Sequence, residues 1–282
     1  MAVCVAMINM KGGVGKTTLA TQIAWHATRQ LDKKVLLIDL DPQANASQSV
    51  MSPQGYVRYL DKGGLTVADI FEQFTPTGTA SGSPRKLDLM KVIHRRVDYR
   101  DGSLLHIVPS RLELSWTLRN PTGKETLLPR FIAKIESNYD LIVIDCSPTD
   151  SILTDAAYHA SRYILVPIRA EFLASIGFPL LDRSIKAFQM RHEDSVIEVC
   201  GLVFNDYMRG GAKRENDLAR KDVEKKAAQY GWYIFKNDIP HSDSYYRSAR
   251  DGMPIDGTKG AHEKVKNEFA VFAAEFFPRI GL

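Results

Sequence analysis

The sequence predicts an α/β fold: a single domain, residues 1–282, built on a mostly parallel, twisted β-sheet with helices on both faces. Two observations support this prediction. Apolar runs rich in β-branched residues alternate with helix-length amphipathic segments, which is the pattern of repeated strand–helix–strand units. The 282 residues are 44% hydrophobic and 25% charged, as is typical of a globular chain with one sizeable core.

The predicted strands are short and apolar, and most are separated by a predicted helix. The strands are expected at Ala2–Asn9, Lys34–Ile38, Leu104–Val108, Leu141–Ile144, Tyr163–Pro167, Val199–Phe204 and Tyr233–Phe235. The helices, which have apolar residues at helical spacing, are expected at Lys16–Arg29, Glu125–Asn138, Phe172–Met190, Lys213–Tyr230 and His262–Phe277.

Residues 53–103 are the least regular part of the chain. Within them, residues 75–84 read TPTGTASGSP, a run of small, turn-forming residues. We expect a flexible surface loop there, inserted into the domain rather than dividing it.

The composition excludes several classes of protein. The net charge is only +4, so the charge alone does not indicate a nucleic-acid-binding protein. Cys4, Cys146 and Cys200 are far apart in apolar runs, which excludes a disulfide framework and a paired-cysteine metal or cluster site. No apolar run approaches the length of a membrane span, and no signal-peptide pattern precedes the first strand, so we expect a cytoplasmic protein.

A glycine-rich turn, MKGGVGKTT at residues 10–18, follows the first predicted strand and opens the first helix. Glycines let the backbone turn its N–H groups toward phosphate oxygens, and the helix N-terminus adds partial positive charge. Lys16 can neutralise β- and γ-phosphates, and the Thr17 hydroxyl can bind Mg²⁺. The turn therefore predicts a nucleoside triphosphate site, formed by Lys11, Gly12, Gly13, Val14, Gly15, Lys16, Thr17 and Thr18.

Aspartates stand at the ends of two other predicted strands. Asp145 ends a strand that should lie beside the first one, where a carboxylate can hold Mg²⁺, often through water. Asp39 and Asp41 end another strand. Each of these residues is also a common loop-capping carboxylate, so position alone does not settle its role.

The turn departs from the usual phosphate-loop pattern, since Met10 replaces a glycine and a second lysine, Lys11, follows. With this departure, KGGVGKTT resembles the deviant Walker A motif of the ParA/Soj/MinD ATPases, a branch of the P-loop NTPases. VLLIDLDPQANAS (residues 35–47) is similar to the family's switch I, and YDLIVIDCSPT (residues 139–149) to its Walker B strand with switch II. The segments LHIVPSRLEL, YILVPIRAEFLASIG and IPHSDSYYRSARDGMPI also look like ParA-type segments in the family's order. The resemblance covers nearly the whole chain and favours ParA over MinD.

The resemblance implies ATP and Mg²⁺ as cofactors and a role for each strand-end aspartate. Asp41 would position or activate the hydrolytic water, and Asp39 would support the metal's hydration shell beside Thr17 and Asp145. Lys11 would reach the phosphates of the nucleotide in a partner subunit, so that ATP drives formation of a homodimer. Lys11, Lys16 and Asp41 are thus the expected catalytic residues.

The sequence indicates the contacts with the nucleotide's base less clearly. Asn205 follows a predicted strand at a position where related folds often place a polar residue against adenine. Pro240 looks like the family's base-flanking proline. Both residues are equally ordinary turn residues.

Basic side chains cluster in the last third of the chain, in a pattern that suits the phosphates of duplex DNA without reading its sequence. The candidates are Arg209, Lys213, Arg214, Arg220, Lys221 and Lys225, followed by Arg247 and Arg250 in a segment that the family also uses for DNA. Interspersed acids leave an ordinary solvated helix as the alternative. The chain also has Arg247-Ser248 where the family often has Glu-Ala, so contacts there are expected to differ.

The C-terminal segment, residues 260–282, carries an apolar stripe of Val265, Phe269, Phe272 and Phe276. Its polar face mixes lysines with glutamates, whereas a helix lying on anionic lipid is rich in lysine and arginine. We therefore expect it to dock on the body of the protein and expect no membrane contact.

Three function classes compete. The first is a ParA-type positioning ATPase of slow intrinsic turnover, similar to the short form without an N-terminal helix-turn-helix. Its ATP-bound homodimer would coat the nucleoid through nonspecific double-stranded DNA, and a ParB-like or other cargo adaptor would stimulate hydrolysis. The second is a MinD-type membrane-associated regulator, and the third is a metabolic enzyme of the same fold, such as an ATP-dependent amide ligase. The whole-chain resemblance favours the first.

Overall fold

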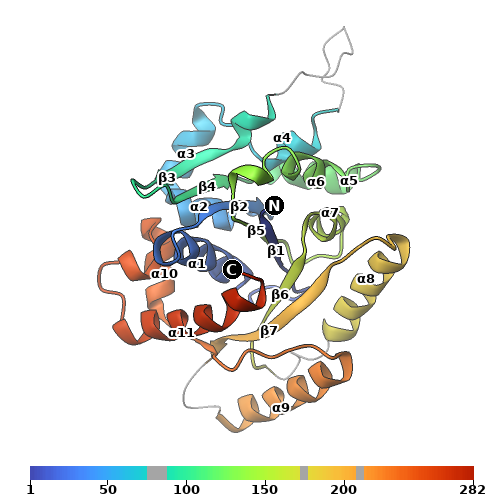
Figure 1. The fold of residues 1–282 in the computed structure, drawn as a ribbon, viewed down its shortest axis with the longest axis vertical. Helices are drawn as coiled ribbons and strands as arrows, with labels where there is room; N and C mark the ends of the chain where they lie inside the picture. Colours follow the sequence, from blue (N-terminus) through green and yellow to red (C-terminus); the bar gives the residue numbers. More distant parts are fainter. Residues whose placement is uncertain (75–87, 172–176, 208–212) are drawn as a thin grey trace.

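The computed structural model describes residues 1–74, 88–171, 177–207 and 213–282 (Figure 1). Its centre is an eight-stranded sheet with the order β3-β4-β2-β5-β1-β6-β7-β8. All neighbouring strands pair in parallel except the antiparallel edge pair of β3 with β4. The strands are β1 (Val3–Met7), β2 (Lys34–Leu40), β3 (His94–Asp98), β4 (Leu104–Val108), β5 (Leu141–Cys146), β6 (Tyr163–Ile168), β7 (Glu198–Tyr207) and β8 (Ile239–Pro240).

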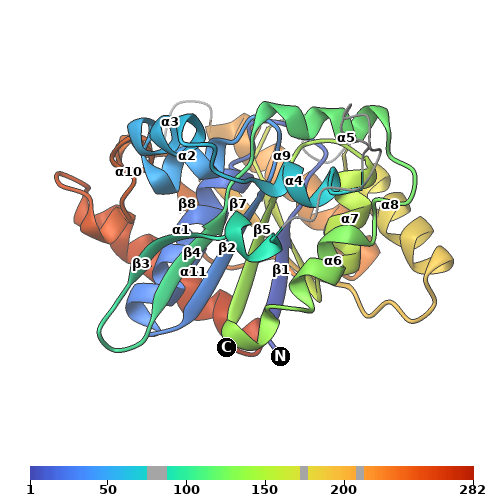
Figure 2. The same ribbon diagram turned by 90° about the horizontal axis from the view of Figure 1, so that it is seen from above.

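Helices cover both faces of the sheet (Figure 2). The α-helices are α1 (Lys16–Gln30), α2 (Asn45–Met51), α3 (Pro53–Asp61), α4 (Val67–Phe71), α5 (Ser115–Arg119), α6 (Leu127–Ile132), α7 (Ile152–Ala160), α8 (Gly177–Arg191), α9 (Lys213–Tyr230), α10 (Asp243–Asp251) and α11 (Glu263–Arg279). Short 3₁₀ turns are η1 (Leu89–Val92), η2 (Leu112–Leu114), η3 (Glu136–Asn138) and η5 (Ile255–Gly257).

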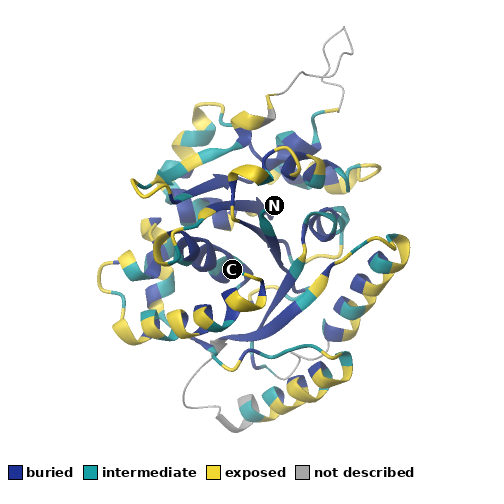
Figure 3. Cartoon of the chain, viewed as in Figure 1, coloured by how far each residue is buried: buried dark blue, intermediate teal, exposed yellow. Residues whose placement is uncertain are grey.

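Strand side chains alternate between two apolar cores, one on each face of the sheet. Val5 and Met7 of β1 belong to the core beneath α1 and α11, while Ala6 and Ile8 belong to the core beneath α4, α6, α7 and α8. A strand buried on both faces carries apolar side chains on both of them, which explains why the sequences of the central strands are unbroken apolar runs. The buried layers are visible on both sides of the central strands in Figure 3.

The predicted fold class is confirmed, and the central parallel strands lie where the sequence predicted them. The predicted strand at Tyr233–Phe235 is wrong: it forms only an isolated bridge, Leu202 with Ile234, and the edge strand β8 follows at Ile239–Pro240. The predicted helix at Glu125–Asn138 is also wrong, because the chain forms the short α6 and the separate 3₁₀ turn η3. Pro129 within α6 cannot donate a helix hydrogen bond, which is consistent with this short element.

Other differences concern less regular parts of the chain. The segment 53–103, expected to be irregular, contains α3, α4 and the antiparallel strand β3. No helix was predicted at α2, α5, α7 or α10. The expected flexible loop at 75–84 and the first residues of the helix expected from Phe172 lie outside the described residues.

The apolar stripe of α11 lies against the body of the protein. Val265, Phe269, Phe272 and Phe276 are all buried, and the ring of Phe272 lies 5.2 Å from that of Phe235. The helix contacts α1 and β8. Within the described residues, no helix is long and apolar enough to cross a membrane.

Shortening one side chain of this stripe should weaken the whole fold. Phe272→Ala leaves a cavity among aromatic rings, so we expect the free energy of unfolding to fall by about 3–5 kcal/mol in urea titrations. Val271 beside it is 51% exposed, so Val271→Ala is a matched control that should change stability by less than about 0.5 kcal/mol. Equal losses in the two variants would contradict the docking of α11.

Candidate nucleotide site

The carboxyl ends of β1, β2 and β5 meet at one edge of the sheet, where the chain changes from strand to loop. Residues 8–15, which include the phosphate loop, connect β1 to α1, whose first residue is Lys16. Gly13 and Gly15 have φ angles of 73° and 88°, in the left-handed region that glycine adopts without strain. The first N–H groups of α1 have no partner within the helix, so this end of the helix can receive an anion.

Asn205 at the end of β7 holds this loop in place. Its side-chain amide donates a hydrogen bond of 2.9 Å to the carbonyl of Val14. A Cβ atom built on Gly15 would stand 1.8 Å from the same amide nitrogen. The loop therefore requires glycine at this position for two reasons: the backbone angle and the close approach of Asn205.

A cavity of about 660 Å³ opens over the loop. Four segments line it: the phosphate loop with the start of α1, the turn after β2, the η2–α5 segment and the turn after β5. The lining residues are Gly12, Gly13, Gly15, Lys16, Thr17, Thr18, Asp41, Pro42, Gln43, Asn45, Leu112, Ser115, Leu118, Ser147, Pro148 and Thr149. This volume suits a small-molecule ligand with several phosphates.

Lys16 is only 7% exposed, and its ammonium group donates hydrogen bonds to the carbonyls of Asn9 at 3.0 Å and Lys11 at 3.1 Å. Burial lowers the pKa of Lys16, while the carboxylates of Asp145 and Asp41 oppose that shift. A buried cation held by neutral carbonyls is a strong binding partner for an anion that enters the site, because little water screens it.

Asp145 and Asp39 are neighbours in the sheet, paired in register on β5 and β2, and both are fully buried. Among the described residues, neither carboxylate oxygen of Asp145 has a hydrogen-bond partner. Burial and the nearby Asp39 raise the pKa of Asp145, and the Thr17 hydroxyl lowers it. A buried carboxylate without a hydrogen-bond partner beside a threonine hydroxyl fits Mg²⁺, which prefers such oxygen ligands. Thr17 and Asp145 are therefore the residues that would hold the metal.

Asp39 has a different environment. One of its oxygens accepts hydrogen bonds from the Ser47 amide at 2.8 Å and the Ser47 hydroxyl at 2.6 Å, and the other accepts from the Asp41 amide at 3.2 Å. Burial raises the pKa of Asp39 to about 7. This geometry supports a role in holding the 41–47 segment over the site. The expected role of Asp39 in the metal's hydration shell stays a prediction.

Asp41 lies at the mouth of the site, where it is 9% exposed and lines the cavity. One oxygen accepts a hydrogen bond of 2.9 Å from the Gln43 amide, which fixes the direction of the carboxylate. Asp41 is thus brought together with Lys16, Thr17 and Asp145, as the sequence predicted for residues of one site.

Lys11 differs from Lys16, because it is not among the residues that line the cavity. Its ammonium group forms an ion pair of 2.5 Å with Glu171, just beyond β6, and the side chain is 38% exposed. The pairing lowers the pKa of Glu171, which also contacts Arg169 at 3.2 Å. No spacing or motif in the sequence indicated Glu171, because only the sheet brings residues 11 and 171 together.

The other sequence-predicted residues lie apart from this cavity. Asn205 donates its amide to the loop, Pro240 is buried in β8, and neither lines the cavity, so their contacts with adenine stay a prediction. Of the DNA candidates, Arg220 is held by Glu224 at 3.0 Å and Asp238 at 2.6 Å, with its guanidinium over the ring of Phe204. That makes Arg220 a structural cation.

The remaining DNA candidates fall into three groups. Lys221 and Lys225 are exposed one turn apart on α9. Arg247 donates to the Gly260 carbonyl at 2.8 Å, and Arg250, 70% exposed, contacts Asp251. Arg209 lies outside the described residues, as do the side chains of Lys213 and Arg214.

The phosphate loop, the strand-end aspartates and the parallel sheet define a P-loop nucleotide-binding protein. A family model described as an AAA domain matches residues 2–198, and the chain belongs to that family. The chromosome-partitioning ATPase Soj of Treponema pallidum is 26% identical over 255 residues, which cover 90% of this chain and 89% of Soj. The cell division protein PomZ of Myxococcus xanthus is 28% identical over 266 residues, 91% of this chain and 73% of PomZ. Within the family, this chain is a ParA/MinD-type ATPase.

Solved structures share the fold. The ATP complex of a single-residue variant of Cyanothece McdA superposes with a TM-score of 0.77 at 16% identity, covering 100% of this chain and 97% of that chain. Cobyrinic acid a,c-diamide synthase from Mycobacterium smegmatis, with an ATP analogue and magnesium bound, gives a TM-score of 0.71 at 23% identity, covering 97% and 93%. ATP and Mg²⁺, the cofactors predicted from the sequence, are thus ligands of this fold.

Replacing Gly15 by alanine should abolish nucleotide binding, because the added methyl group meets the Asn205 amide and the loop must move. Gly13→Ala is the control: it has the same backbone cost but no atom within 4 Å of the new Cβ. The Gly15→Ala/Asn205→Ala double variant should recover part of the loss. Fluorescent ATP-analogue titration measures all three, and equal affinity in the Gly15 and Gly13 variants would refute the close-contact explanation.

The contribution of Asp39 to the stability of the metal-free protein should fall as the pH rises from about 4 to about 7. The unfolded chain releases this proton near pH 3.8, whereas the folded chain holds it until about 7, so the unfolded state is favoured across that interval. Asp39→Asn should remove this component, and Asp61→Asn, an exposed carboxylate, should not. Urea unfolding across the interval measures the difference, and an unchanged pH slope in Asp39→Asn would contradict the assignment.

Proposed function

We propose that this chain is an ATPase that dimerises with Mg-ATP, binds double-stranded DNA without sequence preference in that state, and positions or segregates a cargo. The observation that carries the proposal is the difference between its two loop lysines. Lys16 lies buried in the cavity and suffices for the nucleotide of its own subunit. Lys11 is partly exposed beside the site, in an ion pair with Glu171. A cation in that position is available to a second subunit.

Each site residue then has a role that its contacts support. Lys16 and the loop amides bind the β- and γ-phosphates, and Thr17 with Asp145 hold the metal. Bound Mg²⁺ would neutralise charge on the β- and γ-phosphates. Asp41, fixed by the Gln43 amide, orients the attacking water, and Asp39 keeps the 41–47 segment in place. Hydrolysis breaks the bond from the γ-phosphorus to the bridging oxygen as water adds, giving ADP and phosphate.

The dimer follows from the exchange of partners at Lys11. In the monomer the Lys11–Glu171 pair is partly exposed, so it is worth little and is easily replaced. Across a dimer interface the same lysine would meet a triphosphate, which has a higher charge and less water around it. A cation supplied in this way contributes roughly 10³–10⁵ to the rate in GTPases that use an arginine. Slow turnover in the monomer and stimulation by an adaptor protein fit this arrangement.

The relatives support the proposed role in the cell. Soj is a chromosome-partitioning ATPase, and PomZ is a cell division protein. By analogy with these relatives, we propose that the ATP-bound dimer lies on the nucleoid and that a ParB-like or other adaptor joins it to its cargo. The membrane-regulator alternative rested on the apolar stripe of α11, which is buried against the body of the protein.

Lys11→Ala should still bind ATP but remain a monomer, and Glu171→Gln should dimerise at a lower ATP concentration because its lysine is released. Glu198→Gln breaks the similarly exposed Arg162–Glu198 pair and is the matched control. Light scattering with Mg-ATP, with ADP and without nucleotide measures the mass, and duplex-DNA binding in the same samples across a salt series tests the second half of the proposal. An ATP dimer formed by Lys11→Ala would remove the role in trans, and DNA binding independent of nucleotide would contradict the switch.

A further inference from the structure

A second basic site lies far from α9, in a groove between α3 and the edge strand β3. The groove has a volume of about 350 Å³ and is lined by Met51, Gly55, Arg58, Tyr59, Lys62 and His94. Arg58 on α3 and Lys62, the residue directly after the helix, are four residues apart and both exposed. No carboxylate is among the lining residues, so the groove is cationic.

The charge on these two residues is uncompensated. Several described lysines and arginines elsewhere form ion pairs, such as Arg29 with Asp256 and Lys124 with Glu72. Within the described residues, neither Arg58 nor Lys62 has a carboxylate within 4.0 Å, and Arg58 donates to the Gln54 carbonyl of its own helix. Like charges one turn apart repel each other, so this arrangement weakens the isolated protein. A bound anion would relieve that repulsion.

Two contacts of Tyr59 hold the floor of the groove. The ring of His94 packs edge-on against that of Tyr59 with 5.1 Å between centroids, and the Tyr59 hydroxyl donates to the Leu65 carbonyl at 2.5 Å. Burial and the neighbouring Arg96 and His106 lower the pKa of His94, so near neutral pH the positive charge comes from Arg58 and Lys62.

The groove is continuous with the surface of α10. Arg96 on β3 donates to the Val50 carbonyl at 2.7 Å and to the Gly252 carbonyl at 2.9 Å, which ties the ends of α2 and α10 together. A Cβ on Gly252 would lie 2.9 Å from the Ser52 amide, directly before α3. In Figures 1 and 2, α3, β3 and α10 lie on the same side of the molecule. The end of α10 therefore lies beside the start of α3.

We propose that the α3–β3 groove binds phosphates of the duplex DNA backbone, with Arg58 and Lys62 as the contacts. This inference rests on the proposed DNA binding and specifies where the DNA lies. Exposed, flexible cations without enclosing donors suit a backbone that presents a charge every ~1.7 Å. A small phosphorylated ligand would need a more enclosed set of donors.

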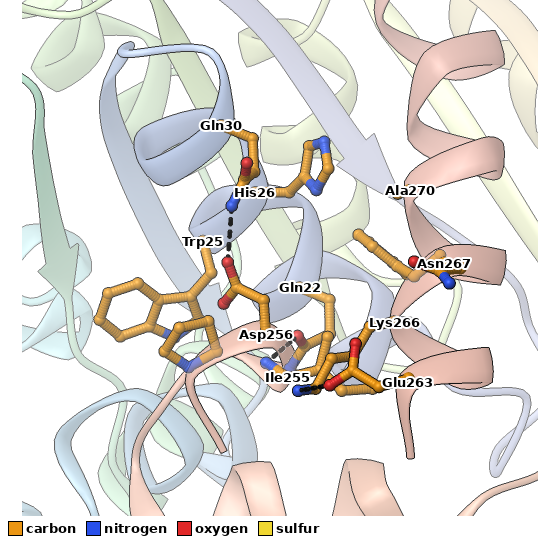
Figure 4. Close-up of a pocket in the computed structure, with 12 residues that line it drawn as sticks. Gln22, Trp25, His26, Gln30, Ile255, Asp256, Glu263, Lys266, Asn267 and Ala270 are labelled. Carbon is orange, nitrogen blue, oxygen red and sulfur yellow. Dashed lines mark hydrogen bonds and ion pairs between the residues drawn. The ribbon is translucent and has the colours of Figure 1, made fainter. Parts of the chain in front are cut away.

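The cavity on the α1–α11 side supplies no competing site. It has a volume of about 430 Å³ and is lined by residues of α1, η5 and α11, which Figure 4 draws as sticks. Several of its polar side chains bond one another: Gln30 donates to Asp256 at 2.7 Å and Lys266 to Glu263 at 2.6 Å. Its mixture of acids and a base points to no single ligand class.

The test compares two double charge reversals of the same composition. Arg58→Glu/Lys62→Glu changes the groove, and Arg130→Glu/Lys134→Glu changes an exposed arginine and lysine, also four residues apart, beside α6 on the other face of the sheet. Duplex-DNA binding is measured with Mg-ATP across a salt series, and mass and thermal unfolding are recorded for each variant. We expect the groove variant alone to bind all duplex sequences more weakly, with the slope of log K against log salt reduced by about 1 for each lost phosphate contact.

The outcomes separate this inference from the proposed function. If the groove variant dimerises with ATP but keeps the affinity and salt slope of the unchanged chain, the inference is overturned while the proposed function stands. If the unchanged chain does not bind DNA, the DNA half of the proposed function fails and the inference with it. With the nucleotide site saturated by Mg-ATP, further thermal stabilisation of the unchanged chain, but not of the groove variant, by tripolyphosphate, together with an unaltered DNA slope, would reassign the groove to a free phosphate ligand. Arg58→Lys/Lys62→Arg should retain DNA binding, because the charge of the groove is kept.

Discussion

The structure depends on the parallel register that brings the ends of β1, β2 and β5 to one edge of the sheet. Asp39 and Asp145 pair across β2 and β5, and Met7 of β1 pairs with Asp145 directly before the phosphate loop. Two carboxylates and a lysine therefore meet in a dry environment, where their charges interact strongly. Burial raises the pKa of both aspartates. A bound metal ion would place positive charge beside the carboxylates, and a bound nucleotide would place negative charge beside the lysine.

The site is held together from outside the loop as well as within it. Asn205, from β7, fixes the Val14 carbonyl, so the seventh strand of the chain takes part in shaping a turn that follows the first. Ser47 and Asp39 hold the turn after β2 over the cavity in a similar way. The Asn205 contact joins the phosphate loop to a distant strand, whereas the Asp39–Ser47 contact holds the turn after β2 against its own strand.

Charge is used differently on different surfaces of the molecule. Arg220, which the sequence suggested as a DNA contact, is bound by two carboxylates and lies over an aromatic ring. Among the described residues, the cations of the α3–β3 groove have no such partners. Paired basic residues add little to the field outside the protein, because their charge is largely neutralised at short range. A basic patch read from sequence therefore needs the structure to show which of its charges remain available.

Much of the fold and the core of the site follow from the sequence alone. The glycine-rich turn between a strand and a helix determines the phosphate loop, since its residue types are the ones that can turn a backbone toward an anion, and the unbroken apolar runs determine a sheet buried on both faces. What the tertiary structure decided are the pairings between distant residues: Lys11 with Glu171, Asp39 with Ser47, Asn205 with Val14, and the approach of α10 to α3. It also decided that Tyr233–Phe235 does not form a strand and that β3 does, because pairing at a sheet edge depends on neighbours that local patterns do not contain. Consecutive residues determine local chemistry, whereas partners separated by many residues are chosen only when the strands take their order.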